Sequence, residues 1–156
     1  MAAMTDFLEN KIIDWLMRAQ AIGITGATAG AGSGPATLYV ALYTATPTDS
    51  TAGTEVTGGS YARVAVTSAL ANWAGTQSAG STTASTGTGG TTSNNGAVTF
   101  PAPTAPWGNV TGFGILDSLT AGNLLIYAAL TTPKTINSGD AAPSFAAGSL
   151  TFQDDN

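Results

Sequence analysis

Apolar residues near the start of the chain recur at helical spacing. Between Asp6 and Gln20 they recur every three or four positions, at Leu8, Ile12, Trp15, Leu16 and Ala19. This spacing places them on one face of a helix. We therefore predict an amphipathic helix with Thr5 as its N-cap and Gly23 as its stop.

Two charged residues of this predicted helix are placed to pair. Asp14 and Arg18 lie four positions apart, which is one helical turn. The apolar face predicts a contact with other subunits or with a larger assembly. Its candidate interface residues are Leu8, Ile12, Trp15 and Leu16.

The next segment has the composition of a linker. Residues 23–36 read GITGATAGAGSGPA and contain few side chains that could be buried. We expect this segment to be flexible, so that the helix can dock on a neighbouring molecule. The predicted division is an N-terminal helix at 1–22, a linker at 23–36 and a β domain at 37–156.

From Thr37 onward the period of the apolar positions changes to two, which is typical of strands. Gly, Pro, Asn and Asp turn signals separate the predicted strands. These strands cover 37–46, 61–67, 97–100, 110–116, 124–130 and 149–152, with 110–116 and 124–130 paired as a hairpin. The pattern favours a mainly β protein, an antiparallel β-sandwich or jelly roll preceded by one amphipathic helix.

One stretch of the β domain is of low complexity. Residues 74–96 consist almost entirely of Gly, Ser, Thr, Ala and Asn, which cannot build a core of their own. We call this segment the arm. We expect it to form a long surface loop that a partner molecule orders.

Charge is scarce along the chain. Charged residues make up 8 % of the sequence, and none lies between Arg63 and Asp117. Uncharged surfaces rich in Ser and Thr are typical of secreted and virion β proteins. The net charge of -5 and the scattered cations, at Lys11, Arg18, Arg63 and Lys134, argue against a nucleic-acid partner.

The absence of cysteine and histidine excludes several chemistries. The chain can form no disulfide, thiolate metal site or iron–sulfur cluster, and it lacks the commonest general base. The apolar runs are shorter than the roughly 18 residues of a membrane span. Without an export signal, we expect the protein to fold in the cytoplasm where it is made.

A few polar residues remain as candidates for chemistry. A serine activated by Lys134 is conceivable, but no nucleophile-elbow motif accompanies this lysine. Carboxylate pairs for glycoside hydrolysis, or an Asp154–Asn156 calcium site, have simpler structural explanations in turns and a tail. The four carboxylates in question are Asp49, Glu55, Asp117 and Asp140. We predict no enzyme and no catalytic, cofactor or metal site.

Aromatic residues in or beside the predicted strands allow two interpretations. Most belong in a core, but exposed ones could stack on sugars or anchor an interface. They are Tyr39, Tyr43, Tyr61, Trp73, Trp107 and Tyr127. A carbohydrate-binding module therefore remains an alternative function.

Several segments resemble a group of small bacteriophage virion proteins. They are the N-terminal TDFLENKIIDWL, then LYVALYTATP at 38–47, GTEVTGGSYARVAV at 53–66 and the stretch 98–140 that begins VTFPAPTAPWGNVTGFGILDS. The group comprises tail-fibre-like proteins and capsid decoration, or cement, proteins. Together the matching segments cover most of the chain.

This resemblance implies a non-enzymatic structural protein of the phage particle, commonly a homotrimer. The first expectation is a cement protein that bridges capsomers by contacting the major capsid protein. The alternative is a tail or head fibre that attaches to the host, where a surface glycan would be a further partner. The resemblance brings no cofactor and no membrane partner.

Overall fold

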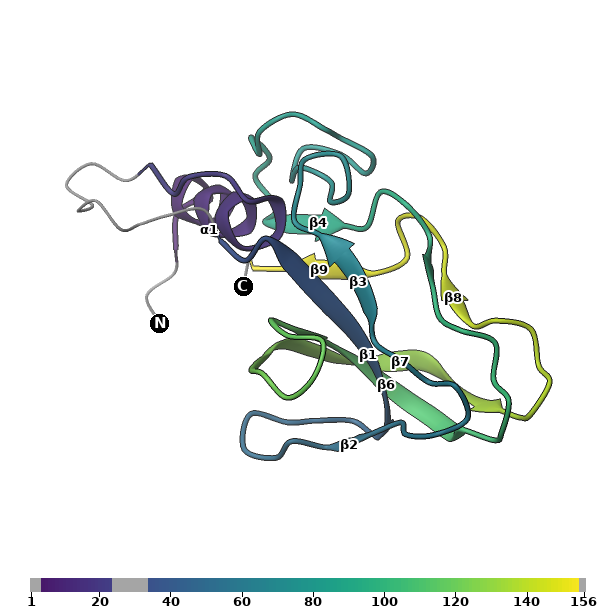
Figure 1. Cartoon of the computed structure of the whole chain (residues 1–156). Coiled ribbons are helices and arrows are strands. Elements are labelled where there is room, and N and C mark those ends of the chain that lie inside the picture. The colour runs from purple at the N-terminus through teal and green to yellow at the C-terminus, as the bar shows by residue number, and fades with distance from the viewer. Residues whose placement is uncertain (1–3, 24–33, 155–156) are drawn as a thin grey trace. The chain divides into compact units, whose positions relative to one another are not determined.

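The computed structural model describes residues 4–23 and 34–154, and Figure 1 shows the chain from its N-terminal helix to its last strand. The protein is mainly β, with antiparallel strand pairs and one N-terminal helix, which confirms the predicted fold class and is consistent with a β-sandwich. The elements are α1 (Asp6–Arg18), β1 (Thr37–Ala45), β2 (Thr54–Glu55), β3 (Val64–Thr67), β4 (Thr91–Ser93), β5 (Val98–Thr99), β6 (Gly108–Leu116), β7 (Leu124–Ile136), β8 (Ser144–Phe145) and β9 (Thr151–Gln153).

The described residues form two compact units, each assembled from separate stretches of sequence. The helix unit takes its described residues from 4–23, 34–36, 67–97 and 145–154. The sheet unit takes its residues from 37–66 and 98–144. The arm therefore groups with the N-terminal helix rather than with the main sheet.

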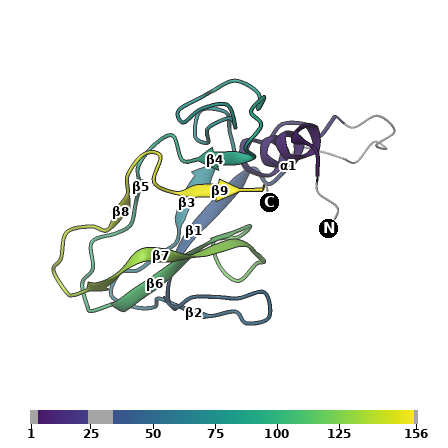
Figure 2. The same ribbon diagram turned by 180° about the vertical axis from the view of Figure 1, so that it is seen from behind.

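The sheet unit contains a five-stranded sheet in the order β2-β1-β6-β7, with β3 also paired to β1. Figure 2 shows β6 and β7 running together as the predicted hairpin. The hairpin turn uses Ala121 and Gly122 at positive φ, and Asp117 accepts hydrogen bonds from the backbone and side chain of Asn123. These bonds hold the pKa of Asp117 below its usual value.

The centre of this sheet is buried on both faces, which gives β1 a nearly continuous run of buried residues. One face pairs Val40 with Ile115 and Leu42 with Phe113. On the other face, Gly112 lies opposite Tyr43 and Gly114 lies opposite Ala41, while Leu116 lies opposite Tyr39 at the end of β6. The missing side chains let neighbouring groups lie directly on the backbone of β6.

Aromatic residues close the core of the sheet unit. Tyr61 stacks on Phe100 and meets Trp107 edge to face, with ring centroids 6.2 Å and 5.3 Å away. Its hydroxyl accepts a hydrogen bond from Leu42 N and donates one to Glu55 Oε1. Burial of this hydroxyl raises the pKa of Tyr61.

Arg63 connects two segments of the sheet unit through its guanidinium. It forms a bidentate ion pair with Glu55, at 2.9 and 2.7 Å, and donates to the carbonyls of Ser118 and Ala121. The hydrogen bond with Glu55 raises the pKa of Arg63, so this link stays charged at neutral pH. The connection pins the β6–β7 turn to the segment between β2 and β3.

In the helix unit, α1 turns a partly charged face inward. Ile13 and Met17 are buried on this face, and so are Asp14 and Arg18, with Arg18 0 % exposed. The predicted pair forms at 2.5 Å between Arg18 Nη1 and Asp14 Oδ1. A buried pair of this kind is stable only where further hydrogen bonds replace its lost hydration.

The arm and the residue before it provide these hydrogen bonds. Arg18 donates to the backbone carbonyls of Trp73 and Thr83 and to the hydroxyl of Ser85. Asp14 accepts from the backbone and hydroxyl of Ser85. The arm, expected to be ordered by a partner, thus packs against α1 of its own chain.

The end of the arm is joined to the C-terminal segment. Strand β4 pairs with β9, and the buried Asn94 donates to the carbonyls of Gly96 and Ala146 while accepting from Leu150 N. The amide nitrogen and the amide oxygen of Asn94 are therefore both used. Such a fully satisfied buried amide fixes one arrangement of the chain.

Several predicted boundaries are wrong, and the longest difference is at β7, which continues to Ile136 instead of ending at residue 130. The helix ends at Arg18, because Ala19 adopts a left-handed conformation with φ 53° and Gln20 N then bonds Asp14 O. The second strand begins at Val64 rather than at Tyr61, whose ring is used in the core. Thr5 is the N-cap as predicted, although it makes no side-chain cap bond. Most of the predicted linker, at 24–33, lies outside the described residues.

Adding a methyl group at Gly112 should destabilise the protein. A Cβ there would lie 2.4 Å from Thr46 Oγ1 and 2.9 Å from the carbonyl oxygen of Ala128. We expect Gly112→Ala to lower the free energy of unfolding by about 1–3 kcal/mol in urea denaturation. Gly96→Ala is the matched control, because its Cβ meets nothing within 4 Å. Equal stability of the two variants would contradict the close packing.

Removing the charge of Arg18 should destabilise the helix unit, because Asp14 would remain buried without its cation. We expect Arg18→Met to cost about 3–5 kcal/mol in the free energy of unfolding. The arm should also become sensitive to limited proteolysis. Lys11→Met, on the same helix but outside the pair, should change stability by less than about 1 kcal/mol. A similar small effect of Arg18→Met would show that the pair does not organise this unit.

Candidate interaction site

The four predicted interface residues lie on the face of α1 that points away from its buried face. Leu8, Ile12, Trp15 and Leu16 are all half-buried, whereas the buried positions are Glu9, Ile13, Asp14, Met17 and Arg18. We call the four half-buried residues the outer stripe. The helix therefore buries charge toward its own unit and leaves aliphatic residues of its other face only partly covered.

The start of the helix and the residues just before it extend this apolar surface. Phe7 is 59 % exposed and Met4 is 40 % exposed, which is unusual for side chains of this size. Lys11 Nζ lies 5.8 Å from the centroid of the Phe7 ring. Phe7 and Met4 thus present apolar side chains to their surroundings, whereas Ile13 and Met17 are buried.

A second candidate surface lies in the sheet unit, where the connection from β1 to β2 folds into a tight turn. Thr48 and Thr51 bond each other through their backbones, at 3.0 and 3.3 Å, and through their hydroxyls at 2.8 Å. Asp49 and Ser50 occupy the tip of the turn, and Ser50 N also donates to Thr48 Oγ1. This web of short-range bonds holds the backbone on both sides of Asp49.

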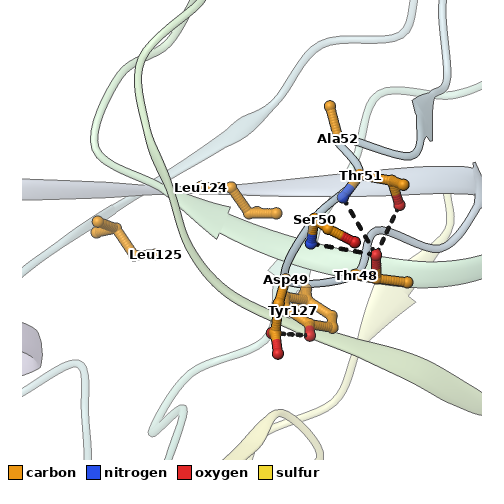
Figure 3. A pocket seen from close by; sticks show the side chains of 8 residues that line it. All are labelled: Thr48, Asp49, Ser50, Thr51, Ala52, Leu124, Leu125 and Tyr127. Atoms are coloured by element: carbon orange, nitrogen blue, oxygen red, sulfur yellow. Dashed lines mark hydrogen bonds between the residues drawn. The ribbon is translucent and has the colours of Figure 1, made fainter.

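Asp49 points at β7. The Tyr127 hydroxyl donates a hydrogen bond to Asp49 Oδ1, and the two side chains face one another in Figure 3. This hydrogen bond raises the pKa of Tyr127, because the phenolate form would lose the bond and meet the carboxylate charge. Asp49 is exposed, so its Oδ2 can accept a hydrogen bond from outside the protein.

An open pocket of about 520 Å³ lies between this turn and the strand β7. Its lining combines hydroxyls, one carboxylate, one phenol ring and two leucines (Figure 3). The residues are Thr48, Asp49, Ser50, Thr51, Ala52, Leu124, Leu125 and Tyr127. None of these described lining residues is Lys or Arg.

The strand β7 is irregular at this pocket. The register pairs Ile115 with Ile126 and Leu116 with Leu124, so Leu125 is an extra residue opposite β6. Such a bulge redirects side chains, and Leu125 is 37 % exposed at the pocket. We call this concavity the Asp49 pocket.

A further pocket of the sheet unit, of about 540 Å³, is lined in part by Glu55, Tyr61 and Arg63. Its charged groups already bind each other in the ion pair described above. The charged groups of this pocket therefore stabilise the sheet unit.

The carboxylates considered for catalysis have separate partners. Asp49 accepts from Tyr127, Glu55 from Arg63, and Asp117 from Asn123. Asp140 accepts from Asn137 N within a turn. Each of these carboxylates thus accepts a hydrogen bond within the fold, as the sequence analysis expects of carboxylates in turns.

Metal-binding and membrane-spanning features can be assessed for the described residues. Residues 4–23 and 34–154 contain no group of three or more acidic side chains arranged to hold a metal ion. Of the tail considered for calcium, only Asp154 lies in this part of the chain. In the same ranges, the helix is too short and too polar to cross a bilayer.

The aromatic residues divide between core and surface. Tyr43, Trp73 and Trp107 are at most 5 % exposed, and Trp107 Nε1 donates to Gly59 O. Trp107 therefore belongs to the core and cannot be an exposed sugar platform. Tyr127 is the aromatic residue that lines the Asp49 pocket.

The meeting of Asp49 with Tyr127 is not predicted from the sequence. The two residues lie 78 positions apart. Turn residues predict a connection after β1, and alternation predicts the beginning of β7 at Leu124. Their contact depends on where the β1–β2 turn folds, which periodicity does not encode.

Comparison with known proteins places this architecture in a family. The family model described as Podophage GP4 fiber I protein gp80 matches residues 3–153. No curated protein matches the chain. Since the family match spans nearly the whole sequence, the protein belongs to the gp80 fibre family and is a fibre-like structural protein of the phage virion.

Proposed function

We propose that this chain is a non-enzymatic subunit of a phage fibre that takes part in attachment to the host. Its family is described as a fibre protein, and the match covers the helix and the strands alike. A fibre needs subunits that associate and a surface that meets the host. The outer stripe and the Asp49 pocket are candidates for these two roles.

The main observation behind the proposal is that α1 turns a charged pair toward its own unit and its apolar stripe away from it. The helix satisfies Asp14 and Arg18 inside its own unit and leaves Leu8 and Ile12 only half-buried on its other face. Covering such a stripe with the same stripe of other copies would remove apolar surface from water, which favours association. We propose a homotrimer built on these helices.

A capsid decoration role is the second candidate. The same stripe could dock on the major capsid protein, and an acidic, charge-poor chain suits the exterior of a phage head. The fibre description of the family favours the first candidate. The two roles differ in where the chain sits on the particle and in how many copies it has.

Polar substitutions in the outer stripe should dissociate the oligomer. We expect the double variant Leu8→Ser/Ile12→Ser to run as a monomer in light scattering, while its circular dichroism stays unchanged because neither residue is fully buried. Leu119→Ser is the matched control, since Leu119 is 53 % exposed in a turn of the sheet unit. It should leave the oligomer intact. A monomeric wild type, or an oligomer unaffected by the double variant, would refute association through α1.

Immunogold labelling of phage particles should separate the two roles. With an antibody to this chain, we expect gold on an appendage and few copies relative to the major capsid protein. Gold spread over the heads, with copy numbers near those of the capsid lattice, would overturn the fibre proposal in favour of decoration. Particles without gold would refute both roles.

A further inference from the structure

We propose that the Asp49 pocket binds a neutral saccharide through the carboxylate of Asp49 and the ring of Tyr127. This inference rests on the proposed role in host attachment and names the ligand class of one site. Its first support is chemical. The pocket combines hydroxyl groups, a carboxylate and an aromatic ring beside leucines, which suits a ligand with hydroxyls on its edges and C–H groups on its faces.

The polar groups of the pocket are held in place before a ligand arrives. The Thr48–Thr51 turn fixes the backbone at Asp49 through bonds of 2.8 to 3.4 Å. Tyr127 then orients the carboxylate through Oδ1. Because this ordering is already complete in the free protein, binding a hydroxyl at Oδ2 costs little conformational entropy.

The apolar part of the pocket comes from β7. The bulge at Leu125 leaves this side chain 37 % exposed in the same pocket as Tyr127. An exposed leucine together with a phenol ring provides a surface for the C–H face of a pyranose. The volume of about 520 Å³ lies within the range of roughly 300–1,000 Å³ that is typical of small-molecule sites.

The charge of the pocket selects against anionic sugars. Among the described residues of its lining, Asp49 is the one charged side chain, and neither Lys nor Arg is present. A carboxylate or sulfate group on the ligand would meet Asp49 without a compensating cation. We therefore expect neutral hexoses and N-acetylhexosamines to bind and sialic acid not to bind.

The test uses the full chain labelled with nitrogen-15 and titrated at millimolar concentrations of glucose, galactose, N-acetylglucosamine and N-acetylneuraminic acid. We expect amide shifts confined to 48–52 and 124–127 with at least one neutral sugar. Asp49→Asn should weaken that binding by roughly tenfold or more, because it loses a hydrogen bond to a charged group. Asp140→Asn, a turn carboxylate outside the pocket, should bind as the wild type does.

Several results would overturn the proposal. They are the absence of shifts at these residues with every neutral sugar, shifts elsewhere, or equal binding by Asp49→Asn and wild type. Preferential binding of the anionic sugar would also refute it. Sugar binding is measured on the purified chain, whereas the fibre role is tested by immunogold labelling of phage particles. One proposal can therefore be refuted while the other is supported.

Discussion

The buried ion pair between Asp14 and Arg18 is the constraint on which the helix unit depends. Two charges removed from water destabilise a protein unless hydrogen bonds surround them. The arm contributes such bonds through the Thr83 carbonyl and through Ser85, groups that need no hydrophobic side chain. A stretch of Gly, Ser and Thr that cannot form a core can therefore still be ordered, because it solvates a charged pair.

The same pair decides which face of the helix remains outside. Periodicity correctly groups Leu8, Ile12, Trp15 and Leu16 on one face, and an isolated amphipathic helix would bury that face. Here Asp14 and Arg18 share the inward face with Ile13 and Met17. An apolar stripe then stays half-buried rather than fully covered, and we propose that subunits associate by covering it.

Elements could be predicted from the sequence better than contacts could. Alternation located β1 and the β6–β7 hairpin, and turn residues located their connections, because these signals are local. The pairing of β4 with β9 and the meeting of Asp49 with Tyr127 join residues far apart in the chain. The sequence does not predict the role of Ser85. Its partner is a carboxylate on a helix far away in the chain, and nothing in the sequence distinguishes this serine from the others in the arm.

Association through the outer stripe would strengthen the binding of a glycan by the Asp49 pocket. An open pocket with one carboxylate and one ring can hold a single sugar only weakly, since much of the ligand stays in water. Association through the outer stripe would place several such pockets on one particle component. Binding several residues of a surface glycan at once then raises the overall affinity without any new contact. A weak pocket on an oligomer can also release each sugar quickly, so that attachment stays reversible until many sites are engaged.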